Sequence, residues 1–206
     1  MHLEHHYGAH NYNPLPAVIS KGQGVHVWNP EGGHYYDFLA AYSALNQGHC
    51  HPRIVDALTE QAQTLTLTSR AFYNNLLGSA EKMLSDTFGY DKVLFMNSGA
   101  EAVETAIKVA RKWGYQNKSL PEDRAKILVV MDNFHGRTIN VISFSTSDDS
   151  RDGFGPFNPG YEVIPYNDAD ALDQAAADPE VVGFLVEPIQ GEAGAVMPDE
   201  GYLKKV

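Results

Sequence analysis

The sequence predicts an α/β fold in which a mainly parallel sheet is flanked by helices. Strand and helix patterns alternate from residue 92 onward, as they do when crossover helices join parallel strands. Residues 127–131 are continuously apolar, which is typical of a strand covered on both faces. Polar groups follow three of the predicted strands. Because ligands of open α/β sheets bind beyond the carboxyl ends of the strands, we expect a binding site there.

The first part of the chain is predicted to hold a loop and a β-hairpin. Residues 7–16 are rich in glycine, asparagine and proline and predict a loop. Residues 25–28 and 35–39 are β-prone, and the turn-forming residues 29–33 separate them, which indicates a hairpin. The histidines near the start (His2, His5, His6 and His10) indicate an irregular terminus rather than a metal site.

Two helices are expected next, over residues 52–65 and 75–88. Pro52 suits the first turn of the first helix, and Gly89 suits the end of the second helix. Apolar residues recur at helical spacing in both segments, so we expect one face of each helix to be buried. These residues are Ile54, Leu58, Ala62 and Leu65 in the first helix, and Leu76, Leu77, Ala80, Met83 and Leu84 in the second.

The alternating region is predicted to contain strands over residues 92–96, 127–131 and 181–186. A further β-prone stretch covers residues 139–145. Helices are expected over residues 100–115, with a buried stripe of Val103, Ala106, Ile107 and Ala110, and over residues 169–177. We divide the chain into an N-terminal segment, residues 1–50, and an incomplete large α/β domain, residues 51–206. No element closes the sheet before Val206, which predicts that the fold continues beyond it.

Composition excludes several classes of function. The net charge of −11 argues against nucleic acid as a partner, because phosphate backbones require a basic face. The sequence contains no run of 18 apolar residues, so it predicts no membrane-spanning helix. The single cysteine, Cys50, permits no internal disulfide and suits a reducing compartment. We therefore expect a cytoplasmic protein, or a mitochondrial-matrix protein if an upstream transit segment has been removed.

The first candidate site residues follow the predicted strand at residues 92–96. Ser98 and Glu101 fit a capping box, and Gly99 allows a ligand to approach the backbone closely. The helix that begins at Ala100 directs free N–H groups and the positive end of its dipole at this point, which favours an anion such as phosphate. The alternative is an ordinary capped helix.

The two other strand ends carry an aromatic residue, an arginine and two carboxylates. After residue 131, Phe134 is able to cover a flat ring and Arg137 to bind a carboxylate. The alternative is a core phenylalanine beside a solvated arginine. After residue 186, Glu187 ends an apolar strand, where a carboxylate requires a partner. Glu187 and Glu192 also allow a glycosidase pair, a weaker reading because the loop sets their separation. We expect no metal site.

These segments together resemble the class III aminotransferases, which are fold-type I enzymes that use pyridoxal 5'-phosphate. Residues 97–102 resemble their phosphate-binding motif, residues 134–138 their ring-stacking motif, and residues 186–192 the strand end beside the cofactor. The resemblance extends over residues 7–203. Residues 7–12, 42–49, 68–75 and 152–157 resemble the subgroup of the family that acts on ornithine.

The resemblance implies roles for particular residues and a partial fold-type I large domain preceded by a hairpin segment. It implies that the cofactor is bound by Ser98, Gly99, Ala100, Phe134, His135 and Glu187, and the substrate by Tyr12, Tyr42, Arg137 and Glu192. It places the Schiff-base lysine beyond Val206, so no catalytic residue is assigned within this chain. It also implies a homodimer.

The reaction implied by the resemblance moves the side-chain amine of ornithine to 2-oxoglutarate. His135 stands where ornithine enzymes often carry tryptophan and where acetylornithine enzymes carry histidine. Acetylornithine and 4-aminobutyrate therefore remain alternative amino donors. A truncated module that binds the cofactor or a phosphate without catalysis is the alternative from another class.

Overall fold

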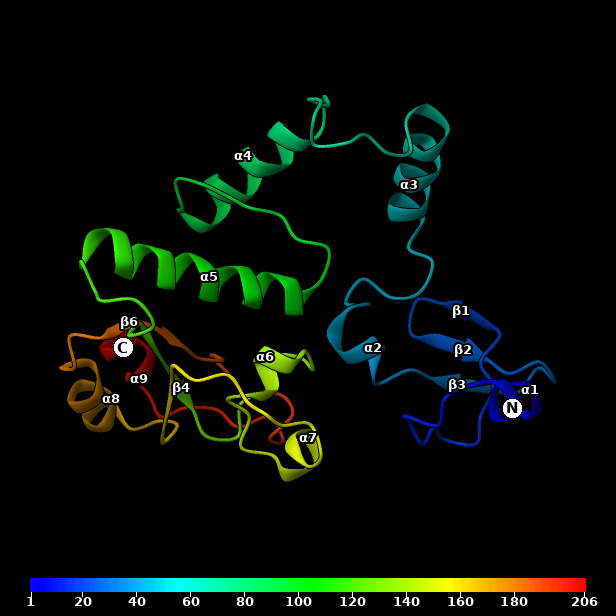
Figure 1. Ribbon diagram of the computed structural model, residues 1–206. Coiled ribbons are helices and arrows are strands. Elements are labelled where there is room, and N and C mark those ends of the chain that lie inside the picture. Colours follow the sequence, from blue (N-terminus) through cyan, green and yellow to red (C-terminus); the bar gives the residue numbers. More distant parts are fainter. The chain divides into compact units, whose positions relative to one another are not determined.

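The computed structural model describes residues 1–206, and the chain divides after Met83 into two compact units (Figure 1). Unit 1 covers residues 1–83 and unit 2 covers residues 84–206. The helices of unit 1 are α1 (His2–Tyr7), α2 (Ala40–Ser43) and α3 (Pro52–Thr64), and its strands are β1 (Lys21–Gln23), β2 (His26–Trp28) and β3 (His34–Tyr36). Helix α4 (Leu77–Phe88) crosses the boundary.

The predicted hairpin is present as β2 and β3, and β1 adds a third antiparallel strand. The Asn29 side chain closes the turn, because its Oδ1 accepts a hydrogen bond of 2.5 Å from the Gly33 N–H. Val27 lies in the middle strand and is 5% exposed, which makes it the buried centre of this small sheet. The turn chemistry read from the sequence therefore produces the expected geometry.

Helix α2 is a short left-handed turn. Residues 40–43 all have positive φ, between 48° and 70°, although none is glycine. A left-handed conformation costs roughly 1–2 kcal/mol per residue, so other contacts must stabilise the turn. The Asp37 carboxylate supplies two of them, accepting the N–H groups of Leu39 and Ala40 at 2.9 Å each. Its other oxygen lies 2.7 Å from His49 Nε2, and these contacts, the Ala40 N–H first, lower the pKa of Asp37.

The expectations for the first residues of the chain and for the buried faces of α3 and α4 need correction. The segment expected to be an irregular terminus forms α1, while residues 8–16 are a loop as predicted. Helices α3 and α4 occur where predicted, but neither contains a buried residue. The apolar face of α3 is present yet exposed, with Leu58 at 69%. Helical spacing places apolar residues on one face, but burial also requires a second element to cover that face.

Unit 2 contains the predicted parallel sheet, with strand order β5-β4-β6. Strand β4 (Lys126–Val130) lies in the centre and pairs in parallel with β5 (Tyr161–Ile164) and β6 (Val181–Leu185). Its helices are α5 (Gly99–Asn117), α6 (Ile139–Ile142), α7 (Asp148–Arg151), α8 (Ala169–Ala176) and α9 (Tyr202–Lys205). The strand β5 is additional to the predicted elements.

Helices cover both faces of this sheet (Figure 1). Alternate residues of β4 point to opposite sides: Ile127 and Val129 pack with Ile107 of α5, and Leu128 and Val130 pack with Leu172 of α8. Leu128, Val129 and Val130 are all 0% exposed. The continuous apolar run therefore forms a central strand, as the sequence predicts.

Two predicted strands are absent from unit 2. Residues 92–96 belong to no strand, since no other strand of this chain pairs with their backbone, and Leu94 is 66% exposed. The β-prone stretch at residues 139–145 instead begins with α6. Its apolar residues Val141, Ile142 and Phe144 are all buried. Val141 and Phe144 pack in the same cluster on the α5 side of the sheet, as residues three apart do on a helix, whereas in a strand they would point to opposite faces.

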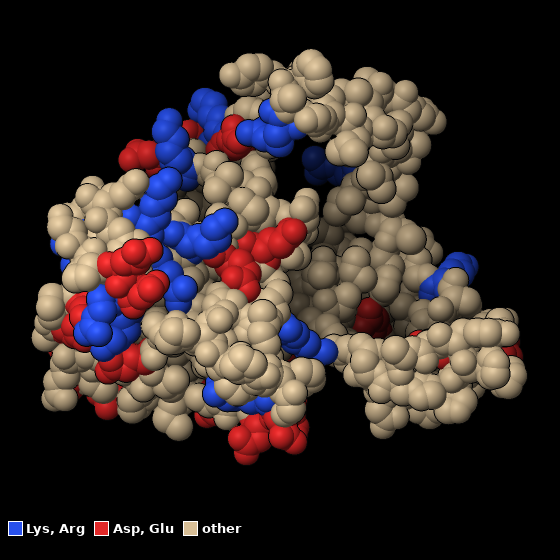
Figure 2. Space-filling model, in the orientation of Figure 1, with Lys and Arg blue, Asp and Glu red and all other residues tan.

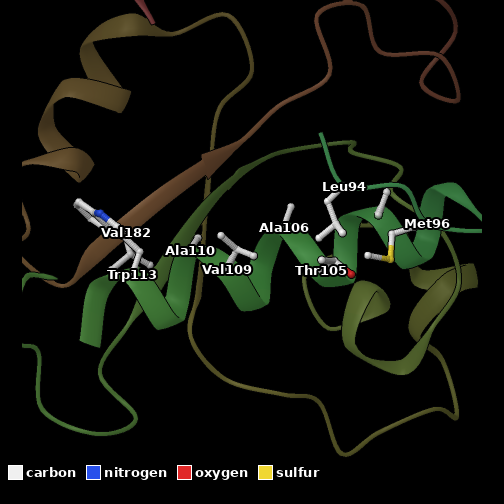
Figure 3. A pocket seen from close by; sticks show the side chains of 9 residues that line it. Leu94, Met96, Thr105, Ala106, Val109, Ala110, Trp113 and Val182 are labelled. Atoms are coloured by element: carbon white, nitrogen blue, oxygen red, sulfur yellow. The ribbon is translucent and has the colours of Figure 1, made fainter. Parts of the chain in front are cut away.

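The edge strand β6 borders an apolar groove of about 460 Å³ (Figure 3). The groove runs along α5, and its lining is Leu94, Met96, Ala102, Thr105, Ala106, Val109, Ala110, Trp113 and Val182. Part of the helix stripe that was expected to be buried therefore lies in a groove: Ile107 is buried, while Ala106 is exposed.

No helix is both long enough and apolar enough to cross a membrane. On the face of unit 2 seen in Figure 2, lysine and arginine side chains are interspersed with aspartate and glutamate over α5.

Candidate functional site

Helix α5 begins with the predicted capping box. Ser98 Oγ accepts the Glu101 N–H at 3.2 Å, and Glu101 Oε2 accepts the Ser98 N–H at 3.0 Å. The first intrahelical hydrogen bond runs from the Ala102 N–H to the Ser98 carbonyl at 3.0 Å. The N–H groups of Gly99 and Ala100 therefore precede the helical hydrogen bonds and remain available to an anion. We call Ser98, Gly99 and Ala100 the phosphate cup.

Residues 134–138, which we call the ring loop, follow the central strand β4. The Phe134 side chain is half-buried, and the Arg137 guanidinium carbon lies 5.9 Å from the centroid of its ring. Gly136 has φ of +119°, and a Cβ built on it would lie 3.1 Å from Ala100 Cβ. Glycine is therefore required where the ring loop meets the phosphate cup.

Glu187, two residues after the end of β6, binds the other end of the ring loop. Its Oε2 accepts the Phe134 N–H at 3.0 Å, and its Oε1 accepts the Gly191 N–H at 3.3 Å. A carboxylate at the end of an apolar strand needs such partners, and here both are backbone groups. The structure thus brings the three predicted strand-end segments together: Ala100 contacts Gly136, and Glu187 contacts Phe134.

His135, in the ring loop, is half-buried, and its ring centroid lies 6.0 Å from that of the buried Phe144. Its Nε2 atom is buried and has no hydrogen-bond partner. Burial lowers the pKa of His135, and the negative charge of Glu187 opposes that shift only in part. The ring is therefore predominantly neutral at pH 7, and its Nε2 is a buried polar atom without a partner within the ring loop.

The geometry of these residues fits a phosphorylated aromatic cofactor. A Cβ built on Gly99 meets no atom within 4 Å, so open space lies beside the free N–H groups of the phosphate cup. Phe134, on the adjoining ring loop, offers an aromatic face, and Glu187 provides negative charge from the next strand end. Pyridoxal phosphate carries the matching groups: a phosphate, a flat ring and a protonated ring nitrogen.

The remaining predicted site residues lie elsewhere. Tyr12 and Tyr42 belong to unit 1 and are 56% and 70% exposed, and Tyr42 is carried by the left-handed turn α2. Glu192 is exposed in unit 2, on a loop closed by backbone hydrogen bonds between Gln190 and Val196.

Two buried amides support the site and were not singled out from the sequence. Asn133 donates to the carbonyls of Val130 at 2.6 Å and Phe144 at 3.1 Å, which fixes the start of the ring loop. Gln190 is 3% exposed and donates to the Met131 carbonyl at 2.7 Å. Asn133 immediately precedes the ring loop and Gln190 lies within residues 186–192, so a polar residue close to a buried strand is the signal that the sequence offers.

Comparisons with known proteins identify the family of this chain. The family model described as "Aminotransferase class-III" matches residues 7–206. A protein of Drosophila ananassae named "Ornithine aminotransferase, mitochondrial" is 59% identical over 203 residues, which are 98% of this chain and 47% of the relative. The chain spans about half the length of the curated relatives it matches.

Solved structures give the same result. The ornithine aminotransferase of Toxoplasma gondii ME49 is 52% identical with a TM-score of 0.97, over 99% of this chain and 48% of that one. The acetylornithine aminotransferase of Elizabethkingia anophelis is 57% identical with a TM-score of 0.85, over 99% of this chain and 50% of that one. With its fold-type I sheet, its strand-end site and a family match over nearly its whole length, this chain belongs to the class III aminotransferases.

Proposed function

We propose that the full-length protein is a pyridoxal-phosphate-dependent transaminase that moves the side-chain amine of ornithine to 2-oxoglutarate. The observation that carries the proposal is the meeting of the phosphate cup, the ring loop and Glu187 at the carboxyl edge of the sheet. The ornithine aminotransferases among the relatives, at 52–59% identity over nearly the whole chain, support ornithine as the donor.

The phosphate cup anchors the cofactor in this proposal. The N–H groups of Gly99 and Ala100 bind its phosphate at the positive end of α5, and the Ser98 hydroxyl completes the contact. Phe134 covers one face of its ring, and His135 next to it packs against the buried Phe144, with 6.0 Å between the ring centroids. When bound, pyridoxal phosphate supplies the electron sink that allows a proton to leave the carbon bearing the transferred amine.

Glu187 acts on the cofactor side of the site. Its hydrogen bonds to the backbone of Phe134 and Gly191 hold the carboxylate in place and hold Phe134 at the ring position. Because His135 is neutral, it adds no positive charge beside Glu187, whose negative charge acts on the His135 ring. A carboxylate fixed in this way favours positive charge on the adjoining ring.

The proposed substrate-binding residues determine which end of ornithine faces the cofactor. We propose that Arg137 and Tyr12 bind the α-carboxylate end, with Tyr42 lining the same pocket, so that the far amine reaches the cofactor. Glu192 pairs with an arginine of the full-length protein while ornithine is bound, and releases it for the 2-oxoglutarate carboxylate. The catalytic lysine is supplied by the full-length protein outside the 206 residues of this chain.

The wider organisation is also proposed from the family. Residues 1–50 form part of a small domain and residues 51–206 part of the large cofactor-binding domain. The full-length protein is a homodimer without nucleic-acid or membrane partners. We propose a cytoplasmic location, with the mitochondrial matrix as the alternative that the Drosophila relative's name favours.

Acetylornithine is the second candidate donor. Two observations favour it: histidine at position 135, and the 57% identity to a protein described as an acetylornithine aminotransferase. The test is to assay the full-length protein with 2-oxoglutarate and either ornithine or acetylornithine. The proposal expects a higher kcat/KM for ornithine, and a clear preference for acetylornithine would replace it with the second candidate.

A further inference from the structure

Glu104 lies one turn after the phosphate cup on α5 and joins this helix to the far end of the ring loop. Its Oε1 accepts the Thr138 hydroxyl at 2.5 Å, and its Oε2 accepts the Asn140 side-chain amide at 2.8 Å. Both donors are uncharged and lie 34 and 36 residues further along the chain. A carboxylate makes shorter and stronger hydrogen bonds to such donors than a neutral acceptor does.

Glu104 and Ala100 lie on the same face of α5, because residues four apart are neighbours on a helix. Ala100 is the residue that Gly136 approaches. One helix face therefore touches the ring loop on both sides of Arg137: through Ala100 at Gly136, and through Glu104 at Thr138.

Asn140, the second hydrogen-bond donor to Glu104, connects this contact to the core. Asn140 Oδ1 accepts the Tyr161 hydroxyl at 2.7 Å and the Asn158 amide at 3.2 Å. Tyr161 belongs to β5, and its ring centroid lies 4.6 Å from that of the buried Phe144. The attachment point of Glu104 is thus fixed by the sheet rather than by a surface loop.

We propose that Glu104 is a positioning residue for Arg137. By fixing Thr138, it holds the neighbouring guanidinium where the α-carboxylate of the amino donor binds. The inference rests on the proposed function for the identity of the donor, and on the hydrogen bonds of Glu104 for the restraint itself.

Three variants of the full-length protein test this role. Glu104→Ala removes both hydrogen bonds, and Thr138→Val removes only the hydroxyl. Glu104→Gln keeps both contacts, because its amide oxygen accepts from Asn140 and its amide nitrogen donates to the Thr138 oxygen. Lys108→Ala is the matched control, an exposed residue one turn further along the same helix.

The first measurement is the ornithine half-reaction under single-turnover conditions. Glu104→Ala and Thr138→Val should raise the Kd for ornithine by roughly 10-fold and about 5-fold, while the limiting rate changes less than about 3-fold. Glu104→Gln should restore the Kd to within about 2-fold, and Lys108→Ala should leave it unchanged. The absorbance spectrum of the bound cofactor should be the same in all variants.

The second measurement needs no activity: hydrogen exchange of the cofactor-free protein. Glu104→Ala and Thr138→Val should speed amide exchange over residues 134–142 and leave residues 126–130 protected. If Glu104→Ala fails to fold, the Kd and the amide exchange of Thr138→Val test the inference instead. Wild-type Kd and wild-type exchange in Thr138→Val would overturn the inference while ornithine turnover stands, whereas a wild-type protein inert toward ornithine would overturn the proposed function.

Discussion

Gly99 occupies the first turn of α5 with open space where a side chain would project. Replacing it with valine should therefore leave the cofactor-free fold intact and obstruct only the phosphate. We expect cofactor affinity to fall on the order of 100-fold, about 2.7 kcal/mol, in Gly99→Val. Equilibrium binding of pyridoxal phosphate, with the melting temperature of the cofactor-free protein as control, measures this. Unchanged affinity would remove Gly99 from the site.

Arg137 and Tyr12 are assigned to the carboxylate end of the donor. Arg137→Leu should lower kcat/KM for ornithine by about 10- to 100-fold, because a hydrogen bond to a charged group contributes about 1.5–3 kcal/mol. Tyr12→Phe loses one hydroxyl and should cost about 1 kcal/mol, roughly 5-fold. Steady-state kinetics of both variants with ornithine check the assignment, which fails if Arg137→Leu matches the wild type.

His135 predicts a pH dependence of stability. Burial lowers its pKa below the ordinary value of 6.5, so the unfolded state binds the proton more tightly than the folded state. The contribution of His135 to stability is therefore fully present above pH 6.5 and is lost as the pH falls through the folded-state pKa. Phenylalanine does not titrate, so in His135→Phe the free energy of unfolding should depend less on pH below pH 6.5. Urea titrations at several pH values test it, and an unchanged slope would contradict the assignment.

At the scale of elements, the left-handed turn α2 is the clearest site of backbone strain. Ala41 has φ of 48° and is exposed, so Ala41→Gly should relieve the left-handed conformation and stabilise the protein by about 1 kcal/mol. The matched control, Ala57→Gly in the right-handed helix α3, should destabilise it by about the same amount. Chemical denaturation of both variants provides the measurement. Equal destabilisation would show that the turn is not strained.

The elements also show how far the sequence determines this fold. The strand β4 was predictable because apolar residues on both faces require cover on both sides. The strand at residues 92–96 was predicted wrongly because a strand exists only when another backbone pairs with it. The sequence of helix α6 favours a strand because β-branched residues dominate it, and a short apolar run does not distinguish a buried strand from a buried helix.

The candidate site divides in the same way. Phe134 and Glu187 follow the ends of β4 and β6, which the parallel sheet brings together. The phosphate cup was predictable from the capping box that begins α5. Glu104 and Asp37 could not be predicted, since their roles depend on partners that only the folded chain places beside them: Thr138 and Asn140 for Glu104, and the left-handed turn for Asp37. Spacing along the chain carries no signal for such contacts.

At the scale of the whole molecule, the apolar groove beside the edge strand β6 predicts self-association of residues 1–206 alone. Val109 and Trp113 both line this groove and are 58% and 49% exposed. A Val109→Lys variant should be measurably more monomeric in sedimentation, because a charge in the groove opposes apolar contact. Lys108→Ala on the same helix should not change it. Equal association of Val109→Lys and wild type would show that another surface is responsible.

The central claim is that the full-length protein transfers the side-chain amine of ornithine. The most direct test supplies the full-length protein with pyridoxal phosphate, 2-oxoglutarate and ornithine labelled with nitrogen-15 only at the side-chain amine, and follows the label by NMR. We predict that nitrogen-15 appears in glutamate over many turnovers while the α-amine of ornithine is retained. Unlabelled glutamate, which would mean transfer of the α-amine, or no glutamate at all, would contradict it.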